Sequence, residues 1–179
     1  MARFSRENWL HLGLDALAEG GPEALTTEAL CTRASLTRGS FYHHFTGMEA
    51  YLGALAQHWH QRDTETIIRL SDAVDTDKLE ALNRLTSALD HRLEQAMRRL
   101  GALHESVRAC IQATDKRRIG HLVKLHIESG DFSPETAELL AQVTYAAFIG
   151  FQQIAPDMPP ETARVAYRRF MALVSQRTP

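Results

Sequence analysis

Residues Thr26 to Phe45, with the sequence TTEALCTRASLTRGSFYHHF, decide the fold. Their pattern predicts a short helix that begins after Thr26, a tight turn, and a second short helix that begins after Thr37. A threonine oxygen can accept hydrogen bonds from the free amides at a helix N-terminus, so we expect Thr37 to cap the second helix. The stretch therefore predicts a helix-turn-helix.

The apolar residues of this stretch predict which sides of the two helices face inward. Leu30 and Ala34 lie four residues apart, and so do Phe41 and Phe45, so each pair shares one face of its helix. We expect both pairs to point inward together with Leu36.

The residues that remain on the outside of the second helix suit DNA. Arg38, Gly39, Tyr42 and His43 form one continuous face. A guanidinium, a bare backbone, a phenol and an imidazole can donate to or accept from phosphates and base edges. Such a face is typical of a helix that enters a DNA major groove. Taken alone, the spacing also fits an ordinary αα-corner with a polar surface.

The sequence on both sides of this stretch is also helical in pattern. An apolar helix is expected from about Ser5 to Glu19, and the residues Gly20-Gly21-Pro22 end it. After the stretch, Thr46 and Glu49 have the spacing of a capping box, which predicts the start of a long helix.

Residues 5–60 resemble the tetracycline-repressor-like (TetR) family of one-component transcriptional regulators. The resemblance rests on the glycine after the first helix, on Thr26-Thr27, on the block Thr-x-Gly-Ser-Phe-Tyr-His-His-Phe, and on Glu49. It implies an all-α protein with an N-terminal three-helix helix-turn-helix DNA-binding head and a C-terminal helical ligand-binding and dimerisation body. The head is expected at residues 1–46 and the body at residues 47–179.

The resemblance also implies which residues contact DNA. The expected set is Thr27, Thr37, Arg38, Gly39, Ser40, Tyr42, His43 and His44. Thr27, Ser40 and His44 are expected at phosphates, and the outward face of the second helix at bases or backbone. An arginine that binds guanine O6 and N7 contributes about 1–3 kcal/mol of discrimination between base pairs.

Three residues depart from the family pattern. Cys31 stands where a small alanine is usual, and Ser35 stands where a turn glycine is common. Met48 replaces a lysine that usually contacts a phosphate, so one anchor to the DNA backbone is missing.

Composition and charge limit the function only loosely. The 179 residues can bury a core, and 44% hydrophobic with 23% charged residues is ordinary for a globular protein. The net charge of −2 predicts modest nonspecific affinity for DNA. The apolar run from Val143 to Phe151 is far shorter than the roughly 20 residues that span a bilayer. With no apolar leader at the N-terminus, a cytoplasmic protein that does not bind membranes is expected.

The cysteines and histidines do not predict a metal site or a cofactor. Cys31 and Cys110 are far apart in sequence and form no CxxC motif, which indicates reduced thiols. The nine histidines include no HExxH motif and no Cys/His cluster. We therefore expect neither a metal ion nor a cofactor.

Apolar stripes predict further helices along the rest of the chain. The helix that opens at Thr46 is expected to end at the polar loop Ser71–Asp77. A helix across Leu82–Leu100 is expected to break at Gly101, and another is expected from about His104 to Thr114. The charged segment Asp115–Arg118 leaves the boundary with the next stripe, Ile119–Ile127, open. The last two helices are expected from Pro134 to about Ala155, capped by Ser133, and from about Pro160 to Gln176.

The body implied by the resemblance contains an effector cavity and a dimer interface. Residues that could line a largely apolar cavity are Trp59, Met97, Leu100, Leu103, His104, Val107, Phe132, Tyr145, Phe148 and Gln152. Most of them are also explained as ordinary core residues. The last two helices are expected to form a four-helix bundle with a second copy. The expected interface residues are Val143, Ala146, Ala147, Gly150, Tyr167, Phe170 and Val174.

The expected function is that of a homodimeric repressor, not an enzyme. It would bind a palindromic operator in double-stranded DNA and leave it when a small, largely apolar effector binds. Two alternatives remain open: a small all-α enzyme that uses His104 or Cys110, and a protein-interaction module whose Tyr42 face binds protein.

Overall fold

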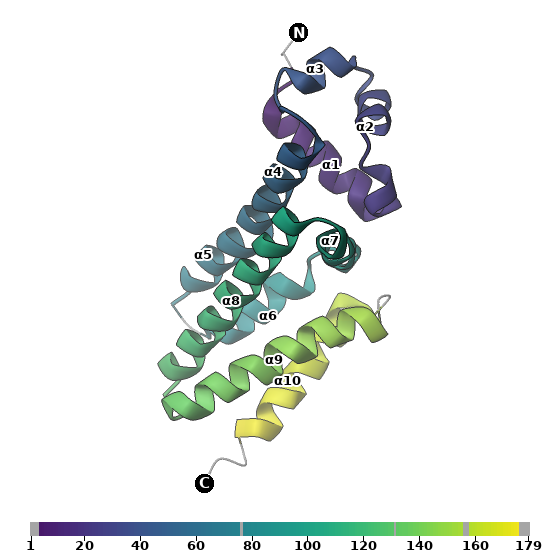
Figure 1. The fold of residues 1–179 in the computed structure, drawn as a ribbon. Helices are drawn as coiled ribbons and strands as arrows, with labels where there is room; N and C mark the ends of the chain where they lie inside the picture. The colour runs from purple at the N-terminus through teal and green to yellow at the C-terminus, as the bar shows by residue number, and fades with distance from the viewer. Residues whose placement is uncertain (1–3, 76, 131, 156–157, 176–179) are drawn as a thin grey trace. The chain divides into compact units, whose positions relative to one another are not determined.

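The computed structural model of the protein describes residues 4–75, 77–130, 132–155 and 158–175, with Val174 and Ser175 described by their backbone alone. Across these ranges every regular element is a helix (Figure 1). The all-α fold class is therefore confirmed. The chain divides into two compact units, Met1–Gln61 with Asp90–Ala113, and Arg62–Leu89 with Thr114–Pro179.

This division does not coincide with the boundary predicted between residues 46 and 47. The first unit also contains α4, Met48–His60, and α7, His91–Leu103, which the sequence assigned to the body. The reason is packing, because α1 contacts both of these helices. The functional division into a DNA-binding head and a ligand-binding body stays a prediction.

The first helix, α1, spans Arg6–Gly20 and agrees with the predicted range. Ser5 caps it: the Ser5 Oγ accepts from the Asn8 amide at 3.1 Å, and the Ser5 amide donates to Asn8 Oδ1 at 2.8 Å. At its other end Gly21 has a φ of 71° and donates to Leu17 O at 2.9 Å. A short 3-10 turn, η1, follows at Pro22–Ala24.

The helix-turn-helix is formed by α2, Thr27–Ala34, and α3, Arg38–Tyr42, as predicted. Thr26 caps α2 by accepting from the Ala29 amide at 3.1 Å. Ser35 ends α2 with a φ of 54° and a ψ of 40°, the left-handed conformation that favours glycine. The turn is therefore built at the position where the family pattern has glycine, with a serine in its place.

A buried aromatic cluster fixes α1, α3 and α4 in the first unit. The Phe41 ring centroid lies 5.4 Å from that of Trp9 and 5.2 Å from that of Tyr51. Tyr51 donates its hydroxyl to Trp9 O at 2.9 Å, and burial raises the pKa of this phenol well above its usual value. Gly13 leaves room for it: a Cβ at this position would lie 1.8 Å from the Tyr51 hydroxyl oxygen.

Two predicted helix boundaries are wrong. Thr46 and Glu49 do not form a capping box, because α4 begins at Met48 after the extended residue Gly47 and has no side-chain cap. The helix predicted across Leu82–Leu100 is split in two, α6 at Lys78–Ser87 and α7, and Gly101 lies inside α7. A new helix begins after Asp90, because Asp90 Oδ1 accepts from the Arg92 amide at 3.0 Å and caps α7.

The helix that opens at Met48 continues beyond α4 through an irregular segment. Residues Gln61–Glu65 form a π-helical turn, η2, before the α-helical geometry returns in α5, Thr66–Asp72. Asp63 and Thr64 in this turn are buried. Such turns bulge the helix by one residue and redirect its side chains, which apolar periodicity does not reveal.

The remaining long helices follow the predicted order. The segment left open at Asp115–Arg118 is continuous helix, because α8 spans Glu105–Glu128. Ser133 caps α9, Pro134–Ile154, by accepting from the Thr136 amide at 3.3 Å, and α10 spans Pro160–Ser175. Within the described residues, no helix is long and apolar enough to cross a membrane.

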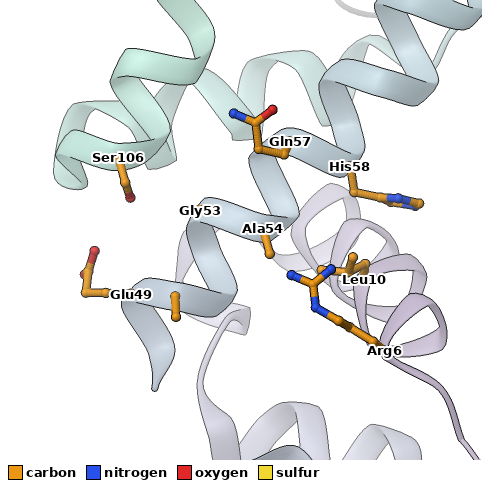
Figure 2. Close-up of a pocket in the computed structure, with 9 residues that line it drawn as sticks. Arg6, Leu10, Glu49, Gly53, Ala54, Gln57, His58 and Ser106 are labelled. Carbon is orange, nitrogen blue, oxygen red and sulfur yellow. The ribbon is translucent and has the colours of Figure 1, made fainter. Parts of the chain in front are cut away.

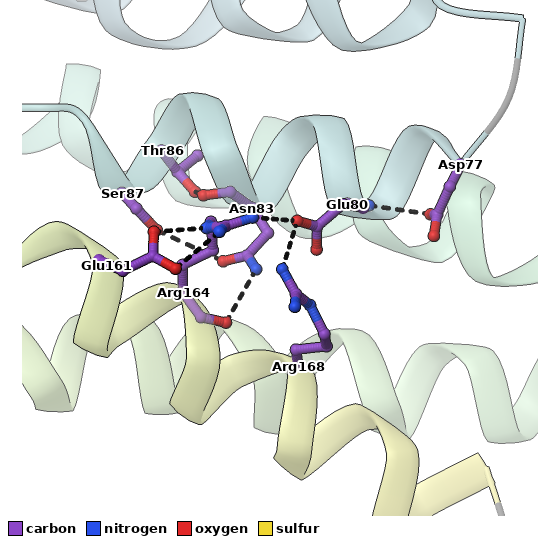
Figure 3. Close-up of polar contacts among 8 residues, drawn as sticks. All are labelled: Asp77, Glu80, Asn83, Thr86, Ser87, Glu161, Arg164 and Arg168. Atoms are coloured by element: carbon purple, nitrogen blue, oxygen red, sulfur yellow. Dashed lines mark hydrogen bonds and ion pairs between the residues drawn. The ribbon is translucent and has the colours of Figure 1, made fainter.

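Charged side chains join α6 to α10 in the second unit (Figure 3). Glu80 Oε1 accepts from Arg164 Nη1 at 2.7 Å and from Arg168 Nη2 at 2.9 Å. Asn83 Nδ2 donates to Arg164 O at 3.2 Å, and Glu161 pairs with the same arginine at 2.7 Å. These contacts orient α10, one of the two helices predicted to form the dimer.

Candidate nucleic-acid interface

The short helix α3 presents the predicted polar face to solvent. Arg38, Gly39, Tyr42 and His43 are exposed, and the Tyr42 side chain is 54% accessible. Phe41, one residue from Tyr42, is fully buried. Because the buried ring anchors the helix from behind, the outer face is held rigidly in a position where another molecule can reach it.

Thr37 does not cap α3 with its side chain, which corrects the prediction. It occupies the N-cap position, but its hydroxyl makes no capping hydrogen bond. The backbone closes the turn instead, since the Ser40 amide donates to Thr37 O at 3.0 Å. Thr37 is exposed, so its hydroxyl can serve a partner molecule.

Gly39 is not required by crowding within the chain. A Cβ there would lie 3.7 Å from Thr37 Oγ1, an ordinary van der Waals distance. If the glycine has a steric role, that role concerns a molecule that approaches α3 from outside.

The three predicted phosphate contacts differ in how they are held. Thr27 and Ser40 are half-buried at the starts of α2 and α3. His44 Nε2 lies 3.1 Å from Phe4 O, so this ring also fixes the residues that lead into α1. Whether any of the three contacts a phosphate stays a prediction.

Both arginines of the helix-turn-helix have an acidic neighbour. Arg33 turns to α1 and binds Glu19 through two contacts of 2.7 and 2.9 Å, which lowers the pKa of Glu19. Arg38 Nη2 lies 3.5 Å from Glu28 Oε2 on α2. Glu28 is not among the predicted site residues, because spacing along the sequence gives no signal for a contact between two different helices.

A groove of about 600 Å³ lies in the first unit beside the N-terminal end of α1 (Figure 2). Its apolar residues are Leu10, Ala50, Gly53 and Ala54, and its polar residues are Arg6, Glu49, Gln57, His58 and Ser106. None of these belongs to the predicted effector set. Glu49 accepts from His104 Nδ1 at 2.8 Å, and the Arg6 guanidinium lies 5.2 Å from the centroid of the Phe45 ring.

The predicted effector residues fall in both compact units. In the first unit Trp59, Met97, Leu100 and Val107 are buried in the core, whereas Leu103 is 68% exposed and His104 pairs with Glu49. Cys110 is buried in the same core. Core packing therefore accounts for the buried members of this group, and their role as effector contacts stays a prediction.

The second unit holds the other predicted effector residues, Tyr145, Phe148 and Gln152, on α9. The Tyr145 hydroxyl donates to Asp115 Oδ1 at 2.6 Å, and its ring stacks on Phe148 with centroids 6.2 Å apart. Gln152 is buried, and Phe132 lies against the His126 ring, 5.7 Å between centroids. These residues combine apolar surface with a few polar groups.

The predicted dimer residues lie partly on exposed apolar surface. Val143 is 52% exposed and Ala146 is exposed, whereas Ala147, Gly150, Tyr167 and Phe170 are half-buried. The side chain of Val174 lies outside the described residues. Further exposed apolar side chains lie on the same two helices and are not among the predicted interface residues: Leu139, Phe151 and Ile154 on α9 and Leu173 on α10.

Comparisons with known proteins agree with this fold. Residues 10–55 match the family model described as bacterial regulatory proteins, tetR family. A transcriptional regulator from Rhodococcus sp. RHA1 has a similar structure, with 21% identity, a TM-score of 0.80, and coverage of 96% of each chain. The reduced form of E. coli NemR matches with 22% identity and a TM-score of 0.75 over 92% of this chain and 96% of that one. A TetR-like transcriptional regulator from Rhodococcus sp. RHA1 matches with 15% identity and a TM-score of 0.74 over 96% and 98%. No curated protein matches the chain in sequence.

Proposed function

Since the chain belongs to the TetR family of regulators through its N-terminal helix-turn-helix domain, we propose that it is a homodimeric, effector-responsive repressor. Its two helix-turn-helix domains bind successive major grooves of a palindromic operator, about 34–36 Å apart or a little more. A small, largely apolar effector favours a state of the dimer in which these domains are wrongly spaced.

One observation carries the DNA-binding part of the proposal. The outer face of α3 offers Arg38, Tyr42 and His43 to solvent while Phe41 is buried behind it. A polar face on a short, rigidly anchored helix has the shape and hydrogen-bonding groups that the major groove accepts.

The dimer is supported by the outer face of α9. Leu139, Val143 and Ile154 are 65%, 52% and 80% exposed, and they recur along one helix. An exposed apolar stripe of this kind marks a surface that another molecule covers. In a closed dimer a second copy of α9 and α10 covers it.

The effector is supported by the composition of α9 and its neighbours. Tyr145 and Gln152 are buried and Phe148 is half-buried, and together they are mainly apolar with few polar groups, which suits a small and largely apolar molecule. To change the operator from mostly bound to mostly free, the effector has to prefer the non-binding state by several kcal/mol.

This function needs no catalytic step, and contact with chromosomal DNA places the protein in the cytoplasm.

Selection of bound sequences from random double-stranded DNA tests the proposal. We expect the wild-type protein to enrich an inverted repeat, and Arg38→Ala and Tyr42→Ala to lose it. Arg69→Ala serves as the control, because it removes an exposed cation from α5 in the second unit. If no sequence is enriched at low salt, even with refolded and ligand-stripped protein, the proposal is wrong.

A further inference from the structure

Glu28 and Arg38 form an ion pair on the exposed surface of the helix-turn-helix. Glu28 lies in the first turn of α2, and Arg38 is the first residue of α3. Arg38 Nη2 and Glu28 Oε2 are 3.5 Å apart, and the two side chains are 67% and 79% exposed. The acid therefore lies beside the cation that the proposed function assigns to the DNA bases.

The other arginine of this segment has a different role. Arg33 is bound by Glu19 of α1 through two short contacts, so it is held against the domain itself. Between Thr26 and Phe45 the sequence contains no other acid than Glu28 and no other Lys or Arg than Arg33 and Arg38. Glu28 and Arg38 are therefore the two formal charges of this segment that are not bound to α1.

Stability does not explain this pair. Exposed ion pairs contribute little to folding, because water screens both charges and the side chains lose freedom when they meet. An acid on a DNA-binding surface also repels phosphates, so it weakens binding to DNA of any sequence. Glu28 lies in the first turn of α2, where the helix dipole favours a carboxylate, but that effect does not require Arg38 beside it. The position of the acid next to Arg38 therefore has its additional effect where DNA is bound.

We propose that Glu28 is a specificity-determining residue that holds Arg38 for base recognition and keeps it from phosphates. The inference rests on the proposed function, since it presupposes that α3 enters the major groove. Specificity is a difference between affinities, and a repulsive element raises it by weakening binding to the wrong sites.

The geometry indicates how Glu28 acts. It contacts one terminal nitrogen of Arg38 at 3.5 Å, so the other guanidinium donors remain available to guanine O6 and N7. At a base pair without guanine, the most favourable alternative partner for Arg38 is a phosphate. The negative charge of Glu28 repels phosphates and so opposes that contact. The pair thus favours guanine sites over phosphate contacts that any sequence offers.

The test compares four proteins on the same random DNA pool and on one DNA of scrambled sequence: wild type, Glu28→Gln, Arg38→Ala and the double variant. Glu23→Gln is the matched control, because it changes the net charge by the same amount from the exposed η1 turn of the same domain. Thermal unfolding of each variant checks that the fold is unchanged.

We expect Glu28→Gln to bind scrambled DNA about three- to tenfold more tightly than wild type, with a salt dependence steeper by about one unit of log–log slope. At the one base pair recognised by Arg38, its discrimination should fall about tenfold. In the Arg38→Ala background, which lacks the inverted repeat, Glu28→Gln should restore no base preference. Glu23→Gln alone should select the same sequence as wild type.

Two results would overturn the inference while the proposed function stands. In the first, wild type enriches an inverted repeat and Glu28→Gln enriches the same repeat with equal discrimination at every position. In the second, Glu28→Gln weakens binding to all sequences, so that Glu28 is a favourable contact. If wild type enriches no sequence, the proposed function itself fails and the inference fails with it.

Discussion

Glu80 joins α6 to α10 within the second unit, because its Oε1 lies 2.7 Å from Arg164 Nη1. The same oxygen accepts from Arg168 at 2.9 Å, and these arginine contacts hold the pKa of Glu80 below its usual value. The Glu80 carboxylate binds both Arg164 and Arg168, and it therefore positions α10, one of the two helices predicted to form the dimer.

Removal of this charge should loosen α10. We expect Glu80→Gln to lower the free energy of unfolding by about 1–2 kcal/mol, since two arginines lose their charged acceptor. The melting temperature should fall by about 2–4 °C for each kcal/mol. Glu161→Gln is the control, because Glu161 is 69% exposed and should contribute less than about 0.5 kcal/mol. Equal losses in the free energy of unfolding for the two variants would show that Glu80 stabilises the protein no more than Glu161 does.

A second prediction concerns the contact between Gly13 and Tyr51. A Cβ on residue 13 would lie 1.8 Å from the Tyr51 hydroxyl oxygen, so Gly13→Ala should cost about 1–3 kcal/mol through overcrowding. Tyr51→Phe removes that oxygen together with its hydrogen bond to Trp9 O. In a double-mutant cycle measured by denaturant unfolding, Gly13→Ala should cost less in the Tyr51→Phe background. Additive costs would contradict this packing.

The serine in the left-handed turn gives a third prediction. Ser35 has a φ of 54°, a conformation that glycine adopts at lower cost than serine. We expect Ser35→Gly to stabilise the protein by about 0.5–1 kcal/mol in thermal unfolding. Ser35→Val should destabilise it, because a β-branched side chain fits this conformation poorly. If Ser35→Gly lowers the free energy of unfolding, the left-handed conformation of residue 35 does not cost serine more than glycine.

A fourth prediction concerns pH. His126 and His121 are buried, and desolvation lowers the pKa of each ring below its usual value of about 6.5. The unfolded chain therefore binds more protons than the folded protein below about pH 6.5, so stability should fall as the pH drops through that value.

Unfolding experiments between pH 8 and pH 5 can assign this loss to a residue. His126→Leu should make the free energy of unfolding less dependent on pH below about pH 6.5. Above about pH 7.5, its free energy of unfolding should differ from that of wild type by a constant amount. His126 is fully buried and lies against Phe132, so a leucine occupies an apolar site. If wild type and variant lose stability in parallel on acidification, His126 does not contribute.

Local signals in the sequence were sufficient for much of the fold. The inward positions of Leu30 on α2 and Phe41 on α3 follow from local apolar spacing, and both are buried. Phe45 is buried as predicted, although it lies beyond Tyr42, where α3 ends. Ser133 before Pro134 marks the start of α9, because a capping residue followed by proline depends on the local backbone alone.

Features that depend on contacts between helices were not predictable in the same way. Thr46 and Glu49 have the spacing of a capping box, but Glu49 bonds to His104, which is 55 residues away. The restart of the helix at Asp90 interrupts an apolar stripe that is regular in sequence. At the candidate site, the pairing of Glu28 with Arg38 depends on how the turn brings two helices together.

The most direct test of the central claim is equilibrium binding to the selected operator and to a scrambled DNA of equal composition, for wild type and Tyr42→Ala. Wild type should bind the operator at least about 10³-fold more tightly than the scrambled DNA at physiological salt. Tyr42→Ala should lose at least about tenfold of that preference with unchanged thermal unfolding, because Tyr42 is exposed on α3. Equal affinity of the wild-type protein for both DNAs would contradict the account.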